Sequence, residues 1–117
     1  MKPIRVILSP KAEEAYRWLN EKAPTSKAER SLLTAIKNKV ELIKANPHYG
    51  DPIAKALIPR QYVEEYGITN LFRVELPLFW RMLYSLTNGE SQVEIIAFVL
   101  DIAEHEKYDK LFGYKRK

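Results

Sequence analysis

The first half of the chain begins with a short apolar run and continues with residues spaced as in a helix. The run Ile4–Leu8 is rich in β-branched residues and ends at Ser9-Pro10, which predicts a strand. Pro10 suits the first position of a helix, because its missing N–H needs no partner there, and Ser9 can cap that helix. Apolar residues then recur at helical spacing until Ala23-Pro24, where we expect the helix to end.

A second helix is predicted directly after the first. Ser26 with Glu29 three residues later fits a capping box, and Pro47 disfavours the helical conformation at Asn46. Between these ends a continuous apolar stripe is formed by Leu32, Leu33, Ile36, Val40 and Ile43. Because the connection between the helices is only about three residues long, they should pack as an antiparallel hairpin.

The second half of the chain is rich in strand patterns. Strands are predicted over Asn70–Leu76, Trp80–Leu86 and Gln92–Leu100. Asn88-Gly89 lies between the last two and is a strong signal for a hairpin turn.

Two more helices are predicted on either side of these strands. One covers Pro59–Tyr66, with the proline at its first position, and is closed by Gly67. The other is opened by a capping box of Asp101 and Glu104 and runs through Phe112. The element order predicts an α+β fold: a mostly antiparallel sheet, an N-terminal α-hairpin packed on one face and a C-terminal helix near the other.

Side chains of a strand alternate between the two faces of a sheet, and here the two sets differ. The set expected to meet the α-hairpin is almost wholly apolar: Phe72, Val74, Leu76, Trp80, Met82, Tyr84, Leu86, Val93, Ile95, Ala97 and Val99. The opposite set is mixed: Arg73, Glu75, Arg81, Leu83, Ser85, Glu94, Ile96 and Phe98. Leu83, Ile96 and Phe98 need a cover, and we expect the C-terminal helix to supply it.

Length and composition limit the number of domains, the cysteine chemistry and the expected location of the protein. The chain has 117 residues and 13.7 kDa, so we expect one domain over residues 1–117. With no cysteine, it has no disulfide, thiol nucleophile or thiolate metal site. No apolar run is long enough to cross a bilayer, and the first residues lack a secretory signal, which predicts a cytoplasmic protein.

Charge and sheet pattern together predict a cleft for a polyanion. The net charge is +4 and the pI is near 9.3, which favours an anionic partner. Arg73 and Arg81 would form the floor of a shallow cleft on the mixed face. The C-terminal helix would form its wall with His105 and Tyr108, while Lys55 and Arg60 would line the rim.

Such a cleft fits cleavage of RNA by its own 2′-hydroxyl. This reaction needs a base, an acid, and positive charge around the phosphorane, but no metal. His105 suits acid or base work, Tyr108 can orient the nucleophile or stack on a base, and two arginines can grip the phosphate. A metal site is not expected, because the two histidines have no spacing that joins them to carboxylates, and no cofactor is implied.

Each of these residues also has a purely structural interpretation. Arg73 and Arg81 can pair with Glu75 and Glu94 on a solvated sheet face. The tyrosine of the last helix can be a packing residue, and the histidine in its acidic run can be an exposed surface residue.

Four segments occur in a characteristic order along the chain. They are SPKAE from Ser9, NLFRV from Asn70, FWRMLY from Phe79 and HEKYDKL from His105. With the two-helix hairpin, they make the chain similar to the RelE/ParE superfamily of toxin–antitoxin toxins, closest to the RelE- and HigB-like members. The segment Ile53–Gly67 is longer than is usual in that family.

The resemblance implies a ribosome-dependent mRNA endonuclease that works without metal and is neutralised by a cognate antitoxin. It implies catalytic roles for Arg73, Arg81, His105 and Tyr108. The lysines and the arginine expected to contact RNA are Lys55, Arg60, Lys107 and Lys110. Two alternatives stay open: a ParE-like toxin that binds DNA gyrase, and a catalytically silent binding module with the same fold.

Overall fold

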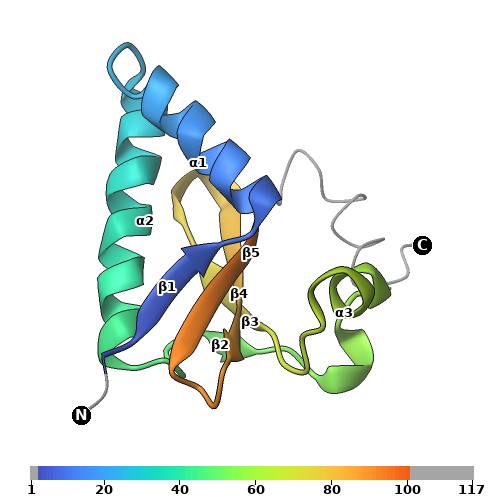
Figure 1. Cartoon of the computed structure of the whole chain (residues 1–117). Helices are drawn as coiled ribbons and strands as arrows, with labels where there is room; N and C mark the ends of the chain where they lie inside the picture. Colours follow the sequence, from blue (N-terminus) through green and yellow to red (C-terminus); the bar gives the residue numbers. More distant parts are fainter. Residues whose placement is uncertain (1–2, 101–117) are drawn as a thin grey trace.

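A single five-stranded sheet organises the chain in the computed structural model, which describes residues 3–100 (Figure 1). The spatial order of the strands is β1-β5-β4-β3-β2. Their bounds are β1 Arg5–Leu8, β2 Asp51–Pro52, β3 Phe72–Glu75, β4 Trp80–Thr87 and β5 Gln92–Leu100. β1 runs parallel to β5, and the other neighbouring pairs are antiparallel.

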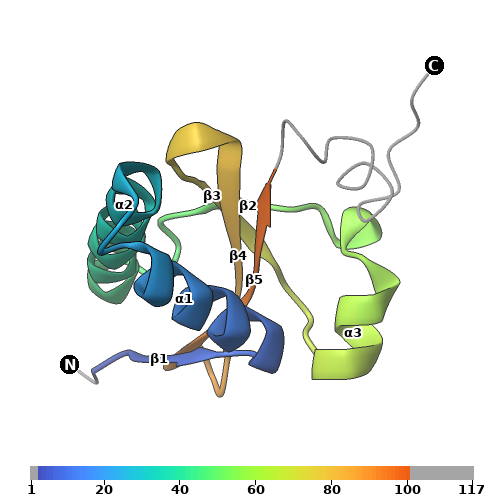
Figure 2. The ribbon, with the colours of Figure 1, turned by 90° about the horizontal axis from the view of Figure 1, so that it is seen from above.

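Helices lie on both sides of this sheet. Their bounds are α1 Pro10–Lys22, α2 Lys27–Ala45 and α3 Arg60–Tyr66, with 3₁₀ turns η1 Lys55–Leu57 and η2 Pro77–Phe79. Figure 2 shows α1 and α2 on one side of the sheet and α3 on the other. The predicted α+β fold with its α-hairpin is thereby confirmed, whereas the helix predicted from Asp101 lies outside the described residues. None of the helices within residues 3–100 has the length and hydrophobicity needed to span a membrane.

The helices begin close to the predicted residues, but their N-terminal capping does not always follow the prediction. Ser9 caps α1 by accepting a hydrogen bond from the backbone N–H of Ala12 at 3.1 Å. Ser26 is the N-cap residue of α2, but its hydroxyl donates to the Glu29 carboxylate instead of accepting from the backbone. In α3, Pro59 occupies the N-cap position rather than the first helical position.

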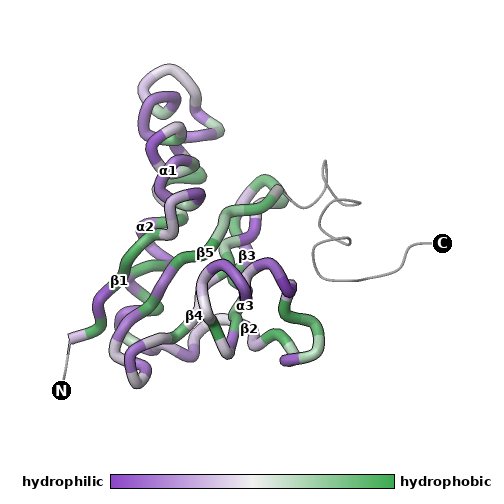
Figure 3. Tube along the Cα trace, turned by 45° about the vertical axis from the view of Figure 1, so that its right-hand side comes forward, coloured by the Kyte–Doolittle hydropathy of each residue, from purple (hydrophilic) through white to green (hydrophobic). Residues whose placement is uncertain are grey.

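The main core lies between the α-hairpin and the face of the sheet that it covers. Apolar side chains from both layers meet there: Ala12, Leu19, Leu32, Leu33, Ile36, Ile43, Phe72, Val74, Leu76, Met82, Tyr84, Leu86, Val93 and Ile95. In Figure 3 the hydrophobic colour follows β1 and β5, whereas the hydrophilic colour dominates α1. The amphipathic stripes read from the sequence are therefore the surfaces that hold the helices on the sheet.

A β-bulge interrupts the pairing of β4 with β5. Leu83 is paired with Ala97, but the next residue, Tyr84, is paired with Ile95, so Ile96 is an extra residue in β5. One extra residue reverses the facing of every side chain that follows it in that strand.

The reversal corrects the predicted face of three residues. Phe98 packs against the main core with the α-hairpin, although simple alternation assigned it to the opposite face. Ala97 and Val99 were assigned to the hairpin face and instead pack on the opposite side. The alternation from Phe72 to Ile95 is as predicted.

The bulge is held by the start of α1. The fully buried Ser9 hydroxyl donates to the carbonyl oxygen of Ile96 at 2.6 Å while it accepts from Ala12. The backbone N–H of Ser9 donates to the carbonyl oxygen of Ile95 at 2.9 Å. One serine therefore caps the first helix and satisfies the backbone at the irregular point of β5.

A second, smaller core lies on the face of the sheet opposite the hairpin. Leu83 and Ile96 are buried under Tyr62, Ile68 and Leu71, which come from the segment around α3. The long segment between β2 and β3 therefore covers these residues, a contribution that the sequence pattern does not predict. The C-terminal helix predicted to cover them lies outside the described residues.

Replacing Ser9 with alanine should destabilise the fold by about 1–3 kcal/mol, since it leaves two buried backbone groups without their partner. Denaturant unfolding of Ser9→Ala measures this loss. Ser31→Ala, at an exposed position on α2, is the matched control and should leave the midpoint unchanged. Equal midpoints for wild type and Ser9→Ala would contradict the role assigned to this hydroxyl.

Candidate functional site

Two arginines lie next to each other on the sheet face opposite the α-hairpin. Arg73 is paired with Leu83, and Glu75 with Arg81, in the antiparallel ladder of β3 and β4. Arg73 and Arg81 are therefore diagonal neighbours on one face, a relation in which residues are about 7–8 Å apart. Both are half-buried, so their guanidinium groups form a partly desolvated positive site.

Arg81 is anchored at one end of this site. Its Nη1 donates to the carbonyl oxygen of Trp80 at 3.2 Å, and its Nη2 lies 3.6 Å from the carboxylate of Glu75. The Arg81 side chain is 17% exposed, whereas that of Glu75 is 74% exposed. The structural interpretation, in which an arginine pairs with an acidic neighbour, is thus confirmed for Arg81 and Glu75.

Arg73 lies deeper between its neighbouring strands. It is paired with Asp51 of β2 on one side and with Leu83 of β4 on the other, and its Nε atom is buried. Asp51 is exposed, so an acidic residue stands beside each arginine of the pair.

Tyrosines of α3 lie beside this face. The rings of Tyr62 and Tyr66 are 6.2 Å apart, and Tyr62 is buried against the sheet. Burial raises the pKa of Tyr66, a side-chain hydrogen bond with Ser9 lowers it, and the carboxylates of Glu65 and Glu94 raise it further. Burial also raises the pKa of Glu94, which stands opposite Ser85 in β4. This face of the sheet therefore carries arginine, tyrosine and glutamate side chains that are partly buried from solvent.

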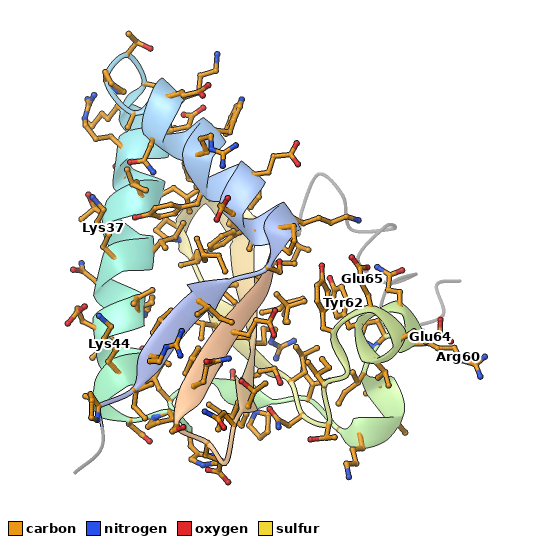
Figure 4. All side chains as sticks on the ribbon, in the orientation of Figure 1. Lys37, Lys44, Arg60, Tyr62, Glu64 and Glu65 are labelled. Carbon is orange, nitrogen blue, oxygen red and sulfur yellow. The ribbon has the colours of Figure 1, made fainter. Side chains whose placement is uncertain are left out.

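Of the remaining predicted site residues, the structure describes Arg60 and Lys55. Arg60 begins α3 and pairs with Glu64 at 3.3 Å, with 89% of its side chain exposed. Figure 4 shows Arg60 and Glu64 on the side of α3 that points away from the sheet, and Tyr62 on the side toward it. Lys55 begins η1 and is exposed. His105, Lys107, Tyr108 and Lys110 lie outside the described residues.

A groove on the hairpin side was not anticipated from the sequence. It has a volume of about 690 Å³, including the part open to solvent, and runs between α2 and the β1–β5 edge. Its apolar lining comes from Val6, Leu8, Tyr16, Ile36, Val40, Ile95 and Phe98, and its charged lining from Lys37, Glu41 and Lys44. Figure 4 labels Lys37 and Lys44 on α2.

Sequence reasoning missed this groove because Ile36 and Val40 belong to the same apolar stripe as the fully packed residues of α2. The available signal was the flanking of that stripe by Lys37 and Lys44, two turns apart on one helix. Within residues 3–100, no three histidine, aspartate or glutamate side chains form a group that can hold a metal ion.

The arrangement of the strands and helices is that of the RelE/YoeB toxins, so the chain has the RelE/ParE toxin fold. The YoeB dimer from Staphylococcus aureus matches with a TM-score of 0.55 and 14% identity over 81% of this chain and 93% of its own. The YoeB/ParE toxin from Agrobacterium tumefaciens matches with a TM-score of 0.58 and 11% identity over 83% and 98%. The toxin RelE of E. coli, a double mutant in the free state, matches with a TM-score of 0.54 and 13% identity over 95% and 96%.

No protein-family model and no curated protein sequence matches this chain. At identities of 11–14%, the likeness concerns the fold. The resemblance to the RelE/ParE superfamily that the sequence indicates is therefore confirmed for the fold.

Neutralising Glu94 should stabilise the protein at neutral pH. Its pKa is raised by burial, so the folded chain binds this proton more tightly than the unfolded chain, and stability falls as the pH rises between the two pKa values. Glu94→Gln should therefore unfold at a higher denaturant concentration than wild type at pH 7. The gain should shrink as the pH falls below the raised pKa of Glu94 in the folded chain, and it should vanish below about 4.3, the ordinary pKa of a glutamate.

Urea unfolding at several pH values measures this difference. Glu14→Gln, at an exposed position of α1, should show no such gain and serves as the control. A midpoint for Glu94→Gln at or below that of wild type at pH 7 would show that ionised Glu94 carries no burial penalty.

Proposed function

We propose that this protein is the toxin of a toxin–antitoxin system and cleaves mRNA on the ribosome by attack of the 2′-hydroxyl, without metal. The observation that carries the proposal is the pair of half-buried arginines on adjacent strands of a RelE/YoeB-type sheet. Two guanidinium groups on one face can bind the non-bridging oxygens of one phosphate in bidentate fashion. They would also stabilise the negative charge that builds up on the phosphorane.

The remaining catalytic roles fall to residues that follow β5. His105 is proposed as the acid or base, and Tyr108 as the group that orients the nucleophile or stacks on a base. Lys55, Lys107 and Lys110 would add contacts to the RNA backbone. Arg60 belongs to this RNA-binding set in the sequence interpretation, but its pairing with Glu64 on the outer side of α3 favours a helix-stabilising role.

The position of α3 limits where an RNA can bind. Among residues 3–100, Tyr62 and its neighbours cover Leu83 and Ile96, so these residues leave accessible the end of the face that carries Glu75 and Arg81. That end is also where β5 finishes, because Leu100 is paired with Trp80. His105 and Tyr108 follow Leu100 by five and eight residues in the sequence. The chain order therefore supports a site that combines these two residues with the arginines.

A purely binding function is the second candidate, and the groove on the hairpin side supports it. The groove has an apolar floor, and its rim carries Lys37 together with the ion pair of Lys44 and Glu41, which leaves one positive charge in excess. This lining fits a segment of a partner protein that carries apolar residues and an acidic residue. We assign this groove to the cognate antitoxin, on the face away from the arginines. If the protein is a ParE-like toxin or a catalytically silent binding module, it would still bind the antitoxin in this groove but would not cleave RNA.

Arg81→Ala should lower the rate of mRNA cleavage on programmed ribosomes by about 10²–10³-fold, because a positioned charge at the transition state is lost. Primer extension on translated mRNA, with purified protein added, detects the cuts, and end analysis should find 5′-hydroxyl and cyclic-phosphate termini. Arg17→Ala is the matched control, because it removes the same charge from an exposed ion pair of α1 on the hairpin side, and should cut like wild type. Equal cleavage by wild type and Arg81→Ala would exclude the arginine pair as the active site.

Lys37→Glu should weaken binding of the antitoxin by about five- to tenfold, since a like charge would face the acidic residues of the partner. The partner to test is the product of the adjacent open reading frame, and calorimetric titration at low and high salt measures its affinity. Lys27→Glu, an exposed residue at the start of the same helix that does not line the groove, is the control. An antitoxin that binds both variants with wild-type affinity would place its docking surface elsewhere.

A further inference from the structure

The carboxylate of Glu75 occupies the position at which an anionic ligand would meet Arg81. The two residues are directly opposite each other in the β3–β4 ladder, and Nη2 of Arg81 lies 3.6 Å from Oε1 of Glu75. Charge-assisted bonds of this type are about 2.7–2.9 Å long when they are fully formed, so the pair is loose.

The two partners of this pair differ in their freedom to move. Arg81 is 17% exposed and is also held by the carbonyl oxygen of Trp80, whereas Glu75 is 74% exposed at the end of its strand. A bound ligand can therefore displace the carboxylate into solvent, but the guanidinium stays where it is.

Three ion pairs within helices do not have this asymmetry. In Arg17–Glu13, Lys44–Glu41 and Arg60–Glu64 the basic side chain is 66%, 45% and 89% exposed, and the partners are three or four residues apart in one helix. Those are ordinary surface pairs within a helix. The His48–Glu90 pair joins two loops, but its side chains are about equally exposed, at 60% and 63%. The Glu75–Arg81 pair instead joins two strands and covers a cation that is already largely removed from water.

Arg73 stands in a similar setting. It is directly opposite Asp51 of β2, so acidic and basic residues alternate across β2, β3 and β4 on this face. An acidic residue therefore stands directly opposite each of the two arginines while no ligand is bound. The positive potential that an incoming phosphate meets is correspondingly reduced.

We propose that Glu75 is a resident counter-ion that closes the anion site at Arg81, so that phosphate must displace it to bind. The carboxylate stabilises the desolvated guanidinium in the free protein and competes with phosphate for it. Glu75 therefore lowers the affinity of the site for anions. It favours ligands that offer two phosphate oxygens, because two hydrogen bonds to Arg81 are stronger than the single loose contact with the carboxylate. For RNA as the ligand, this inference rests on the proposed function.

Glu75→Gln keeps the shape of the side chain and removes the competing charge. It should raise the affinity for inorganic phosphate, and for a short single-stranded RNA with 2′-O-methyl groups that cannot be cleaved, by about two- to fivefold. The phosphate titration is followed by the NMR signal of the Arg81 side-chain Nε–H, and the RNA titration by fluorescence anisotropy. Thermal unfolding checks that the variant is folded.

Two further variants make the test specific. Glu64→Gln removes one carboxylate from an ion pair on the outer side of α3 and should leave both affinities unchanged. In the double variant Glu75→Gln/Arg81→Ala the gain should disappear, because the cation for which the carboxylate competes is gone.

The possible results separate this inference from the proposed function. Tighter phosphate binding by Glu75→Gln, without RNA binding by any form, would support the counter-ion role and contradict the RNA site. An unchanged or weaker phosphate affinity in Glu75→Gln, an equal gain in Glu64→Gln, or no phosphate binding by wild type and Glu75→Gln alike would overturn the inference.

Discussion

The contact of Ser9 with the bulge in β5 is the constraint on which the rest of the arrangement depends. A single buried hydroxyl accepts from the backbone N–H of Ala12, in the first turn of α1, and donates to the carbonyl oxygen of the extra residue, Ile96. The start of the helical hairpin is thereby tied to the one point where β5 changes its facing. Beyond that point Phe98 turns toward the hairpin, and Ala97 and Val99 turn toward α3. The bulge at Ile96 thus decides which side chains at the end of β5 face the α1–α2 hairpin and which face α3.

Most of the fold was predictable, because amphipathic stripes, caps and turn residues are local signals. The α-hairpin, the Asn88-Gly89 turn and the facing of Arg73 and Arg81 follow directly from spacing of 3.6 or 2 residues. The bulge was not predictable, because its partner Ser9 is 87 residues away from Ile96 and nothing in the local sequence of β5 marks it. The cover by α3 was missed for a related reason: Tyr62 packs on the sheet only through tertiary contacts, and a seven-residue helix shows too little periodicity to reveal its apolar side.

The two faces of the sheet carry two different kinds of chemistry. On the hairpin side, the groove at the β1–β5 edge is apolar with lysines around it. On the other side, the arginines are half-buried and stand beside acidic residues from adjacent strands. A protein segment in the groove and a phosphate at the arginines would not overlap, since the sheet separates them. Inhibition by a partner bound in the groove alone would then require a change in the sheet or a further contact that reaches around its edge.

The parallel pairing of β1 with β5 has a consequence for synthesis. β1 is made well before β5, yet the two are neighbours in the sheet, and β5 is the last strand of the described residues. While translation proceeds, the hairpin helices can form, but the surface they cover is incomplete until β5 has left the ribosomal tunnel. Pairing of β1 with β5 consequently comes after the synthesis of all the elements between them, and a nascent chain that still lacks β5 cannot complete the five-stranded sheet.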